Sequence, residues 1–238
     1  ADTDKVFKYI NTCRDMGVKV LPPDINSGRP RFSVHDGAVV FGLSGIKNVG
    51  EEAVLEIVEE RERNGPYTDL VDLCRRVNLR RVTKRMLEYL IKAGAMDCFG
   101  RSRAGLLAGL DKAHALGQRQ AKEKQSGMIS MLDMLGGPDK GAGNGLPVNI
   151  EEFHAEEWPD EEKLRLEKEA LGFFLSSHPL LGWRHELARL RLNTLDECRE
   201  LANGSEVRLA LLFTSVKEYV TKKGDKMAFV GAEDLTAT

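Results

Sequence analysis

The first part of the chain passes from a helical to an extended pattern of apolar positions. Apolar residues spaced three or four apart predict a helix over residues 4–16, which Gly17 ends. Two consecutive prolines follow, so an extended segment is predicted there, because proline cannot continue a helix. Two short apolar runs, residues 32–34 and 38–41, then flank an Asp-Gly pair, which is typical of a β-hairpin.

Residues 42–60 read GLSGIKNVGEEAVLEIVEE and predict a tight turn followed at once by a helix. The apolar stripe of that helix is Ala53, Val54, Ile57 and Val58. Free amide N–H groups at a helix start, with Lys47 beside them, suit an anion. This is the pattern of a helix-hairpin-helix element, which binds nucleic-acid phosphates without reading bases, although a corner that only packs is the alternative. The predicted phosphate contacts of the turn are Gly45, Ile46, Lys47, Asn48, Val49 and Gly50.

Three more helices are predicted beyond this element. A Gly-Pro pair ends the first helix, and apolar spacing then indicates helices over about residues 70–77 and 83–94, and from about Ser102 onward. A helix, a glycine-bearing turn and a helix therefore occur a second time, around residues 94–100. The second turn lacks the compact spacing of the first, so we predict that it packs rather than binds.

The last third is predicted to be a linker, a helical part and the start of a β domain. Glycines dominate residues 136–145, which is typical of a flexible linker. A helix is predicted over residues 160–175, with Leu164, Leu171 and Phe174 facing inward. The fold class is therefore mainly α, with a tandem helix-hairpin-helix domain, a small N-terminal α/β-hairpin piece and a C-terminal partial OB-type β segment.

Three strands are predicted in that β segment, over residues 207–214, 217–221 and 227–230. Basic and aromatic residues on such strands are typical of an oligonucleotide-binding barrel. Phe213 and Phe229 are predicted to fill the barrel core. The candidate single-strand contacts are Lys217, Tyr219, Lys222 and Lys223.

Charge is balanced in total but unevenly distributed. The chain has 35 Lys+Arg and 37 Asp+Glu, yet basic residues far outnumber acidic ones from residue 75 to 103, and acidic residues dominate from 151 to 169. A basic segment beside a phosphate-binding turn is the electrostatic pattern of a nucleic-acid binder. The candidate phosphate contacts of this segment are Arg75, Arg76, Arg80, Arg81, Lys84 and Arg85.

The sequence contains no pattern typical of a metal site, a disulfide, a catalytic centre or a membrane segment. The four cysteines have no metal-ligand spacing, so no metal site and no disulfide are predicted. The only D-x-D pair, Asp2 and Asp4, lies at the terminus and is interpreted as a helix cap, so no catalytic residue is assigned. No membrane-length apolar run or signal peptide is seen, and we expect a cytoplasmic location without a membrane partner. The abrupt start and end suggest a piece of a longer protein.

Six segments carry a resemblance to a known family. CRDMGVKVLPPDIN, FGLSGIKNVGEEAV, DLVDLCRRV, LIKAGAMDCFG, LEKEALGFFLSSHPL and VTKKGDKMAFVGAEDLT occur in order and with the right separations. Together they resemble the C-family replicative polymerases, the α subunits of bacterial DNA polymerase III. The resemblance implies the end of the fingers domain (1–41), tandem hairpins that bind duplex DNA (42–120), a clamp peptide and linker (121–147), a helical connector (148–204) and the start of an OB domain (205–238).

The same resemblance implies the partners and the missing chemistry. Duplex DNA, single-stranded template, the sliding clamp and other replicase subunits would be partners. The family's catalytic aspartates and magnesium lie in a palm domain outside this stretch, so the piece alone would hold no cofactor and be inactive. The clamp peptide falls on Met128, Ile129, Ser130, Met131 and Leu132, where Met128 and Leu132 replace the family's usual Gln and Phe. A shifted register with Gln125, Met128 and Ile129 keeps the Gln but disagrees with the neighbouring family pattern, so the first register is preferred. A hairpin module of a repair ligase or structure-specific nuclease, and a protein-interaction scaffold, are the alternative functions.

Overall fold

A computed structural model describes residues 3–125, 151–222 and 224–236. The predicted clamp peptide, residues 128–132, lies outside these ranges. The described chain forms two compact units, and each is considered by itself. One contains residues 18–173, and the other contains residues 1–17 with residues 174–238. The unit of residues 18–173 contains both predicted hairpins. The five domain ranges that the family resemblance implies stay predictions.

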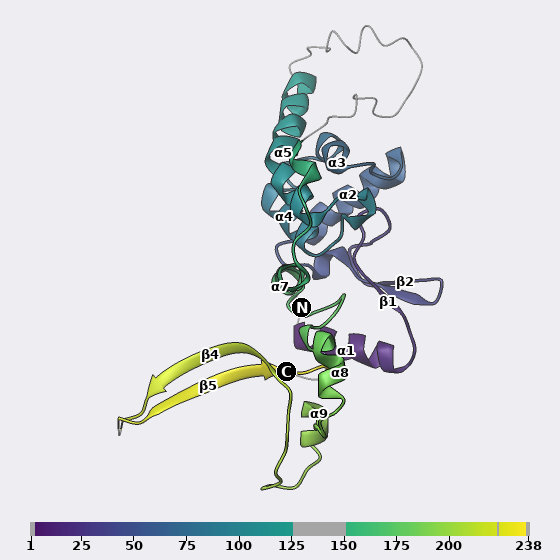
Figure 1. The fold of residues 1–238 in the computed structure, drawn as a ribbon. Helices are drawn as coiled ribbons and strands as arrows, with labels where there is room; N and C mark the ends of the chain where they lie inside the picture. The colour runs from purple at the N-terminus through teal and green to yellow at the C-terminus, as the bar shows by residue number, and fades with distance from the viewer. Residues whose placement is uncertain (1–2, 126–150, 223, 237–238) are drawn as a thin grey trace. The chain divides into compact units, whose positions relative to one another are not determined.

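The larger unit begins with a small sheet that leads into the first hairpin (Figure 1). Its strands are β1 (Val20–Leu21), β2 (Ser33–His35) and β3 (Ala38–Val40), in the order β1-β3-β2. β2 and β3 are antiparallel, as the Asp-Gly turn predicts, and Asp36 and Gly37 both have positive φ, 49° and 76°. The extended segment after α1 contributes the parallel strand β1, which local pattern alone does not reveal.

The helices predicted before the linker in the larger unit are all present. They are α2 (Glu51–Asn64), α3 (Leu70–Arg76), α4 (Lys84–Lys92) and α5 (Arg103–Gln125). Two short 3-10 helices, η1 (Leu43–Gly45) and η2 (Asp97–Phe99), form where turns are predicted. Asp69 and Thr83 cap α3 and α4 through hydrogen bonds from the N–H groups of Asp72 and Met86. Figure 1 shows α3 and α4 beside the long α5. Buried leucines of these three helices form the core between the helices.

After the linker the chain returns to the hairpins. This return segment, residues 151–173, contains η3 (Glu151–His154) and α7 (Asp160–Leu171). Phe153 is buried against α5, where a Cβ on Gly109 would collide with its ring and a Cβ on Gly105 would collide with its backbone carbonyl. The predicted helix 160–175 is four residues too long. Gly172 is left-handed, with φ 92°, and ends α7, so Phe174 lies beyond the helix.

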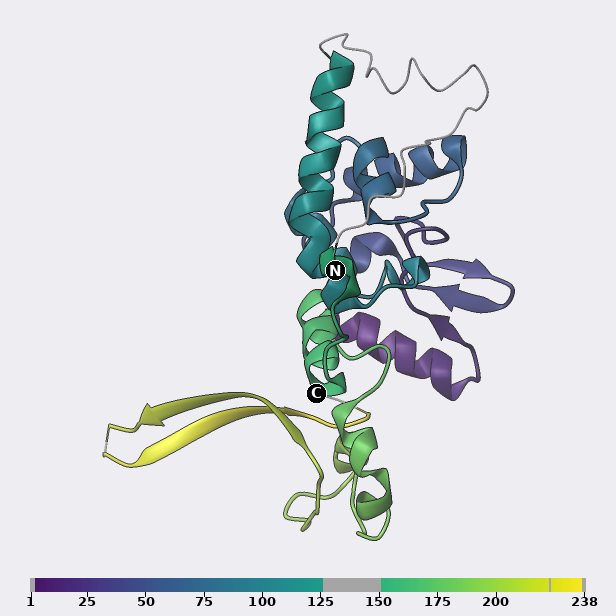
Figure 2. The same cartoon turned by 45° about the horizontal axis from the view of Figure 1, so that its top comes forward.

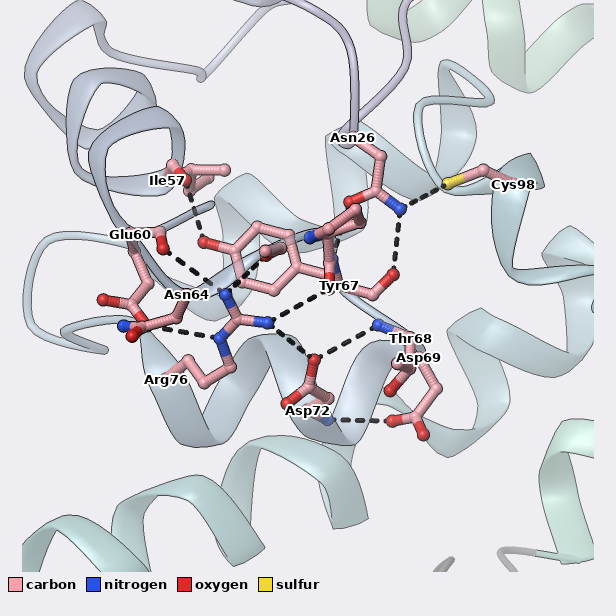
Figure 3. A network of polar contacts seen from close by, with 12 residues as sticks. Asn26, Ile57, Glu60, Asn64, Tyr67, Thr68, Asp69, Asp72, Arg76 and Cys98 are labelled. Carbon is pink, nitrogen blue, oxygen red and sulfur yellow. Dashed lines mark hydrogen bonds and ion pairs between the residues drawn. The ribbon is translucent and has the colours of Figure 1, made fainter. Parts of the chain in front are cut away.

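A polar network ties α2 to α3 and to the segment before the hairpin (Figure 3). Arg76 donates to Glu60 and Asp72 at 3.2 and 3.0 Å, and to the Gly65 carbonyl at 2.7 Å. Its guanidinium lies 4.4 Å from the centre of the Tyr67 ring. The Tyr67 hydroxyl donates to the Ile57 carbonyl at 2.9 Å. Partial burial raises the pKa of Tyr67, so this phenol stays a hydrogen-bond donor at neutral pH.

The smaller unit contains α1 (Thr3–Asp15), the short helices η4 (Pro179–Trp183), α8 (Arg184–Leu187) and α9 (Leu195–Cys198), and two strands. Figure 2 shows β4 (Leu212–Val220) and β5 (Lys226–Glu233) as a long antiparallel ribbon, drawn in olive and yellow. The predicted strands 207–214 and 217–221 fall in one strand, β4, which begins only at Leu212, so residues 207–211 are not part of it. A bulge between Phe213 and Ser215 shifts the register of β4 without breaking the pairing.

The aromatic residues of this ribbon are not in a core. Phe213 is 66% exposed and Phe229 is 60% exposed, so the prediction that they fill a barrel interior is wrong for this structure. A two-stranded ribbon has no second layer to cover either face. Tyr219 packs edge-on against Phe229 with ring centres 5.5 Å apart, and both remain exposed.

Candidate nucleic-acid interface

The first hairpin turn is anchored by its apolar residues and exposes its polar ones. It joins η1 to α2 through residues 46–50, of which Ile46 and Val49 are 2% and 6% exposed. Between them, Asn48 adopts the left-handed region with φ 61°, which asparagine tolerates better than most residues. Lys47, Asn48 and Gly50 are exposed. The turn therefore presents one cation, one amide side chain and a bare glycine to solvent.

Most of the turn's backbone amides are already used inside the protein. The N–H groups of Gly45, Ile46 and Val49 donate to carbonyls of the hairpin itself at 2.9, 3.2 and 3.2 Å. The N–H of Lys47 donates to the carbonyl of Ala170, at the end of α7, at 2.9 Å. The expectation that these four amides hold phosphates is therefore wrong at the level of the N–H groups. The reason is packing, since a buried amide takes an internal acceptor wherever one is in reach.

A smaller set of donors stays available at the start of α2. Gly50 is the N-cap and has no side chain to cap the helix. Within the described ranges, no protein acceptor is found for the N–H groups of Asn48 and Gly50, and the first-turn amides of a helix have no partner in the preceding turn. Glu51 and Glu52 stand in this first turn, and Arg31 lies 3.1 Å from Glu51. The start of α2 thus combines free amides and the exposed Lys47 with two acids, of which Glu51 is paired with Arg31.

The basic segment divides into buried structural residues and exposed ones. Arg76 belongs to the network of Figure 3. Arg103 is 5% exposed and is held by Asp97 at 2.7 Å and by Glu167 at 3.7 Å. Lys92 is held by Glu88 and by Glu169 at 2.7 and 2.9 Å. Burial alone would lower the pKa of Arg103, but the bond to Asp97 and the other nearby acids raise it, so the guanidinium is firmly charged.

Arg76 therefore does not belong to an exposed phosphate site. Its side chain is 15% exposed and its donors are engaged by the protein. The remaining candidates of the segment share the loop between α3 and α4 and the first turn of α4. Arg75 is half-buried at the end of α3, and the exposed members are Arg80, Arg81, Lys84 and Arg85.

This exposed set, called the basic loop from here on, comprises Arg80, Arg81, Lys84 and Arg85. Two contacts place it beside α2, because the N–H of Asn78 donates to Glu56 at 3.0 Å and Arg81 lies 3.5 Å from the same carboxylate. Lys84 is paired with Asp111 of α5. Lys84 and Arg85 also occupy the first turn of α4, where the helix dipole disfavours cations. Local rules are broken most often at functional sites, which favours a binding role here.

The second hairpin is closed. Gly94 and Gly100 have positive φ, 81° and 65°, and form the turn between α4 and α5. A Cβ on Gly94 would collide with the Arg103 guanidinium, so glycine is required there. At the start of α5, Ser102 accepts from the N–H of Gly105 at 3.0 Å, and Glu157 accepts from the two amides before it. The described structure thus agrees with a second hairpin that packs.

The candidate single-strand contacts lie on the ribbon. Lys217 and Tyr219 are exposed on β4, and Lys222 is exposed in the turn after it. Lys223 lies outside the described residues. Their role stays a prediction.

No group of three or more His, Cys, Asp or Glu side chains suited to a metal ion occurs in the described part of the chain. Among the same residues, no helix combines the length and the apolar character needed to cross a lipid bilayer.

Sequence reasoning missed the return segment as part of the hairpin domain. Ala170 supplies the acceptor for Lys47, and the acids Glu157, Glu167 and Glu169 pair with the second hairpin or its helices. The opposite charges of residues 75–103 and 151–169 were the available signal. The two segments partly neutralise each other, so the basic surplus is smaller on the surface than in the sequence.

Comparison with known proteins agrees with the hairpin geometry. The helix-hairpin-helix motif family matches residues 17–106, which cover the sheet, both hairpins and the start of α5. The turn and the match together show that this part of the chain is a helix-hairpin-helix domain, a motif that indicates DNA binding.

Over 98% of its length the chain is 34% identical to DNA polymerase III subunit alpha of Vibrio cholerae and of Treponema pallidum. It is 33% identical to DNA polymerase III subunit alpha of Escherichia coli K12, again over 98% of its length. The chain is thus related to a region of the DNA polymerase III α subunits, which confirms the resemblance seen in the sequence. It spans about a fifth of the length of these relatives, 20% of the Vibrio protein.

Proposed function

We propose that this chain is the part of a replicative DNA polymerase that binds the phosphates of duplex DNA without reading its sequence. The observation that carries the proposal is the pairing of the open first hairpin with the basic loop. Lys47 and the free amides of Asn48 and Gly50 stand at the start of α2, and Arg81 is tied to the same helix through Glu56. Phosphate contacts position a protein on DNA but carry no base information, which suits an enzyme that copies any sequence.

The rest of the proposal rests on the relatives, which are named DNA polymerase III subunit alpha. The whole protein would extend a primer by magnesium-dependent nucleotidyl transfer in the cytoplasm, in a palm domain outside this stretch. Residues 128–132 would attach it to a sliding clamp and so raise its effective concentration on DNA. The ribbon β4–β5 would begin an OB domain that contacts single-stranded template through Lys217, Tyr219 and the lysines of the turn after β4.

The DNA contact can be tested by fluorescence anisotropy with labelled duplexes of two unrelated sequences, titrated between 50 and 200 mM salt. We expect equal affinities for the two sequences and a linear fall of log K with log salt, by about 0.9 for each phosphate neutralised. Lys47→Ala and Arg80→Ala should each weaken binding to both sequences and reduce the slope by about 1.

The matched control is Arg63→Ala. Arg63 is an exposed arginine at the other end of α2, about 20 Å from the turn at 1.5 Å per residue. Its loss should leave the slope unchanged. Absent or salt-independent binding, or an equal effect of Arg63→Ala and Lys47→Ala, would refute phosphate binding at this hairpin and favour a scaffold.

A further inference from the structure

The two hairpins differ at the start of their second helices. The first three amides of α5 are all satisfied within the protein. Ser102 accepts from Gly105 at 3.0 Å, and the two carboxylate oxygens of Glu157 accept from Arg103 and Ala104, each at 3.1 Å. By contrast, α2 begins at a glycine and has no side-chain cap. Among the described residues, the first hairpin therefore lacks side-chain acceptors at the start of α2, whereas the second hairpin has them at the start of α5.

The group that accepts from the first two amides of α5 is the carboxylate of Glu157, which is distant in sequence. Glu157 belongs to the return segment and lies more than fifty positions after the amides it binds. The N–H of Trp158 also donates to it at 3.0 Å, and the Lys163 ammonium lies 3.5 Å away. Three N–H donors and one cation around two oxygens are the donor set that also binds a phosphate oxygen pair.

Electrostatics favour the charged form of this carboxylate. Partial burial alone would raise the pKa of Glu157, but the hydrogen bonds from Arg103, Ala104 and Trp158, together with Lys163, lower it. The side chain nevertheless remains 33% exposed. The position that this carboxylate occupies is therefore in reach of solvent, and the ionised group fills it at neutral pH.

The segment that carries Glu157 is held in place from both sides. Phe153 lies in the glycine-lined groove of α5, and Ser102 donates to the Ala155 carbonyl at 2.6 Å. After Glu157, Glu167 and Glu169 hold α7 to Arg103 and Lys92. Contacts on both sides of Glu157 therefore hold its backbone beside the start of α5, which positions the carboxylate there.

We propose that Glu157 is an intramolecular anion that occupies the phosphate position of the second hairpin and so excludes that hairpin from DNA. The proposal rests on the proposed function, because it assumes that helix starts of this domain bind phosphate. It makes Glu157 the residue that limits the duplex contact to the first hairpin and the basic loop. Removing its charge opens a second phosphate contact at Arg103 and Ala104.

The test compares Glu157→Gln with Glu156→Gln in the whole chain. Glu156 is the exposed neighbour, and its substitution changes the net charge equally without touching the amides. Duplex binding is measured by anisotropy across the same salt series. We expect Glu157→Gln to bind several-fold more tightly at 50 mM salt, with a slope steeper by about 1, the value for one added phosphate contact. Glu156→Gln should keep the wild-type slope.

Amide resonances locate the DNA contact directly, in the wild type and in the variant. In ¹⁵N-labelled wild type, duplex DNA should shift the signals of Asn48 and Gly50 and leave those of Arg103 and Ala104 in place. In Glu157→Gln, all four should shift. Movement of the Arg103 and Ala104 signals in the wild type, or equal slopes for the two glutamine variants, would overturn the proposal. A wild type that binds no duplex would instead refute the proposed function itself.

Discussion

Replacing Arg76 with alanine should destabilise the protein while leaving the DNA contact of the folded molecule nearly intact. The guanidinium donates to Glu60, to Asp72 and to backbone carbonyls that include Gly65, and it lies over the Tyr67 ring. Alanine removes every one of these contacts. It leaves two carboxylates, each less than a fifth exposed, beside each other without a cation.

The expected cost is about 3 kcal/mol. Removing one partner of a buried ion pair costs about 3–5 kcal/mol, since the remaining charges stay desolvated. The lower end applies because the side chains of Glu60 and Asp72 are 16% and 17% exposed and can turn partly to water. A loss of 3 kcal/mol reduces the ratio of folded to unfolded protein by about a hundredfold. Arg76→Lys should recover part of it, because lysine keeps the charge but not the forked geometry.

Urea unfolding and duplex anisotropy together measure the two effects. Arg80→Ala is the matched control, because Arg80 is an exposed arginine of the same basic segment. We expect Arg80→Ala to unfold within about 0.5 kcal/mol of the wild type and to lose a phosphate contact. Arg76→Ala, assayed where it is folded, should bind DNA within about twofold of the wild type. The reasoning is refuted if Arg76→Ala keeps the wild-type urea midpoint and weakens DNA binding as much as Arg80→Ala.

Two further predictions concern packing and thiol reactivity. Gly109→Ala should cost about 1–3 kcal/mol in urea unfolding, because its methyl group would collide with the Phe153 ring. In a Phe153→Ala background the same change should be neutral or stabilising, and an unchanged cost there would contradict the contact. Partial desolvation of the thiol and the nearby Asp24 raise the pKa of Cys98 to about 11, although the residue is exposed. Iodoacetamide at pH 8 should therefore label Cys98 in the native protein at least about tenfold more slowly than in urea, as followed by peptide mass spectrometry, and equal rates would contradict the raised pKa.

Local signals in the sequence were sufficient for the helices and for the first turn. The stripe of Ala53, Val54, Ile57 and Val58 is buried as its spacing predicts, and the caps of α3 and α4 lie at residues chosen for their side-chain oxygens. These features depend on neighbours a few residues apart. The end of α7 is also a local signal, since Gly172 stands within the predicted helix, although the apolar residues after it continue the helical pattern.

Contacts between distant segments could not be predicted in the same way. A count of basic residues does not say which of them face an acid from the return segment, and Arg103 and Lys92 do. Nor does a turn sequence say where its amides point. The N–H of Lys47 finds an acceptor more than a hundred positions away, at Ala170. The candidate phosphate site therefore keeps only part of the amide donors that the turn sequence suggests, and its role stays a prediction.

Under the proposed function, the internal hydrogen bonds of these amides reduce the number of donors left for DNA and make the remaining donors more rigid. A turn whose amides all faced solvent would be held only by its two apolar side chains. Here the bonds of Lys47 and Val49 fix the backbone, so the exposed Lys47 side chain and the N–H groups of Asn48 and Gly50 project from a rigid support. Fewer donors bind with less enthalpy, but preorganised donors lose less entropy on binding. A replicative enzyme must release each phosphate as the duplex advances, and a small rigid contact supplemented by the basic loop suits that requirement better than a cradle of many amides.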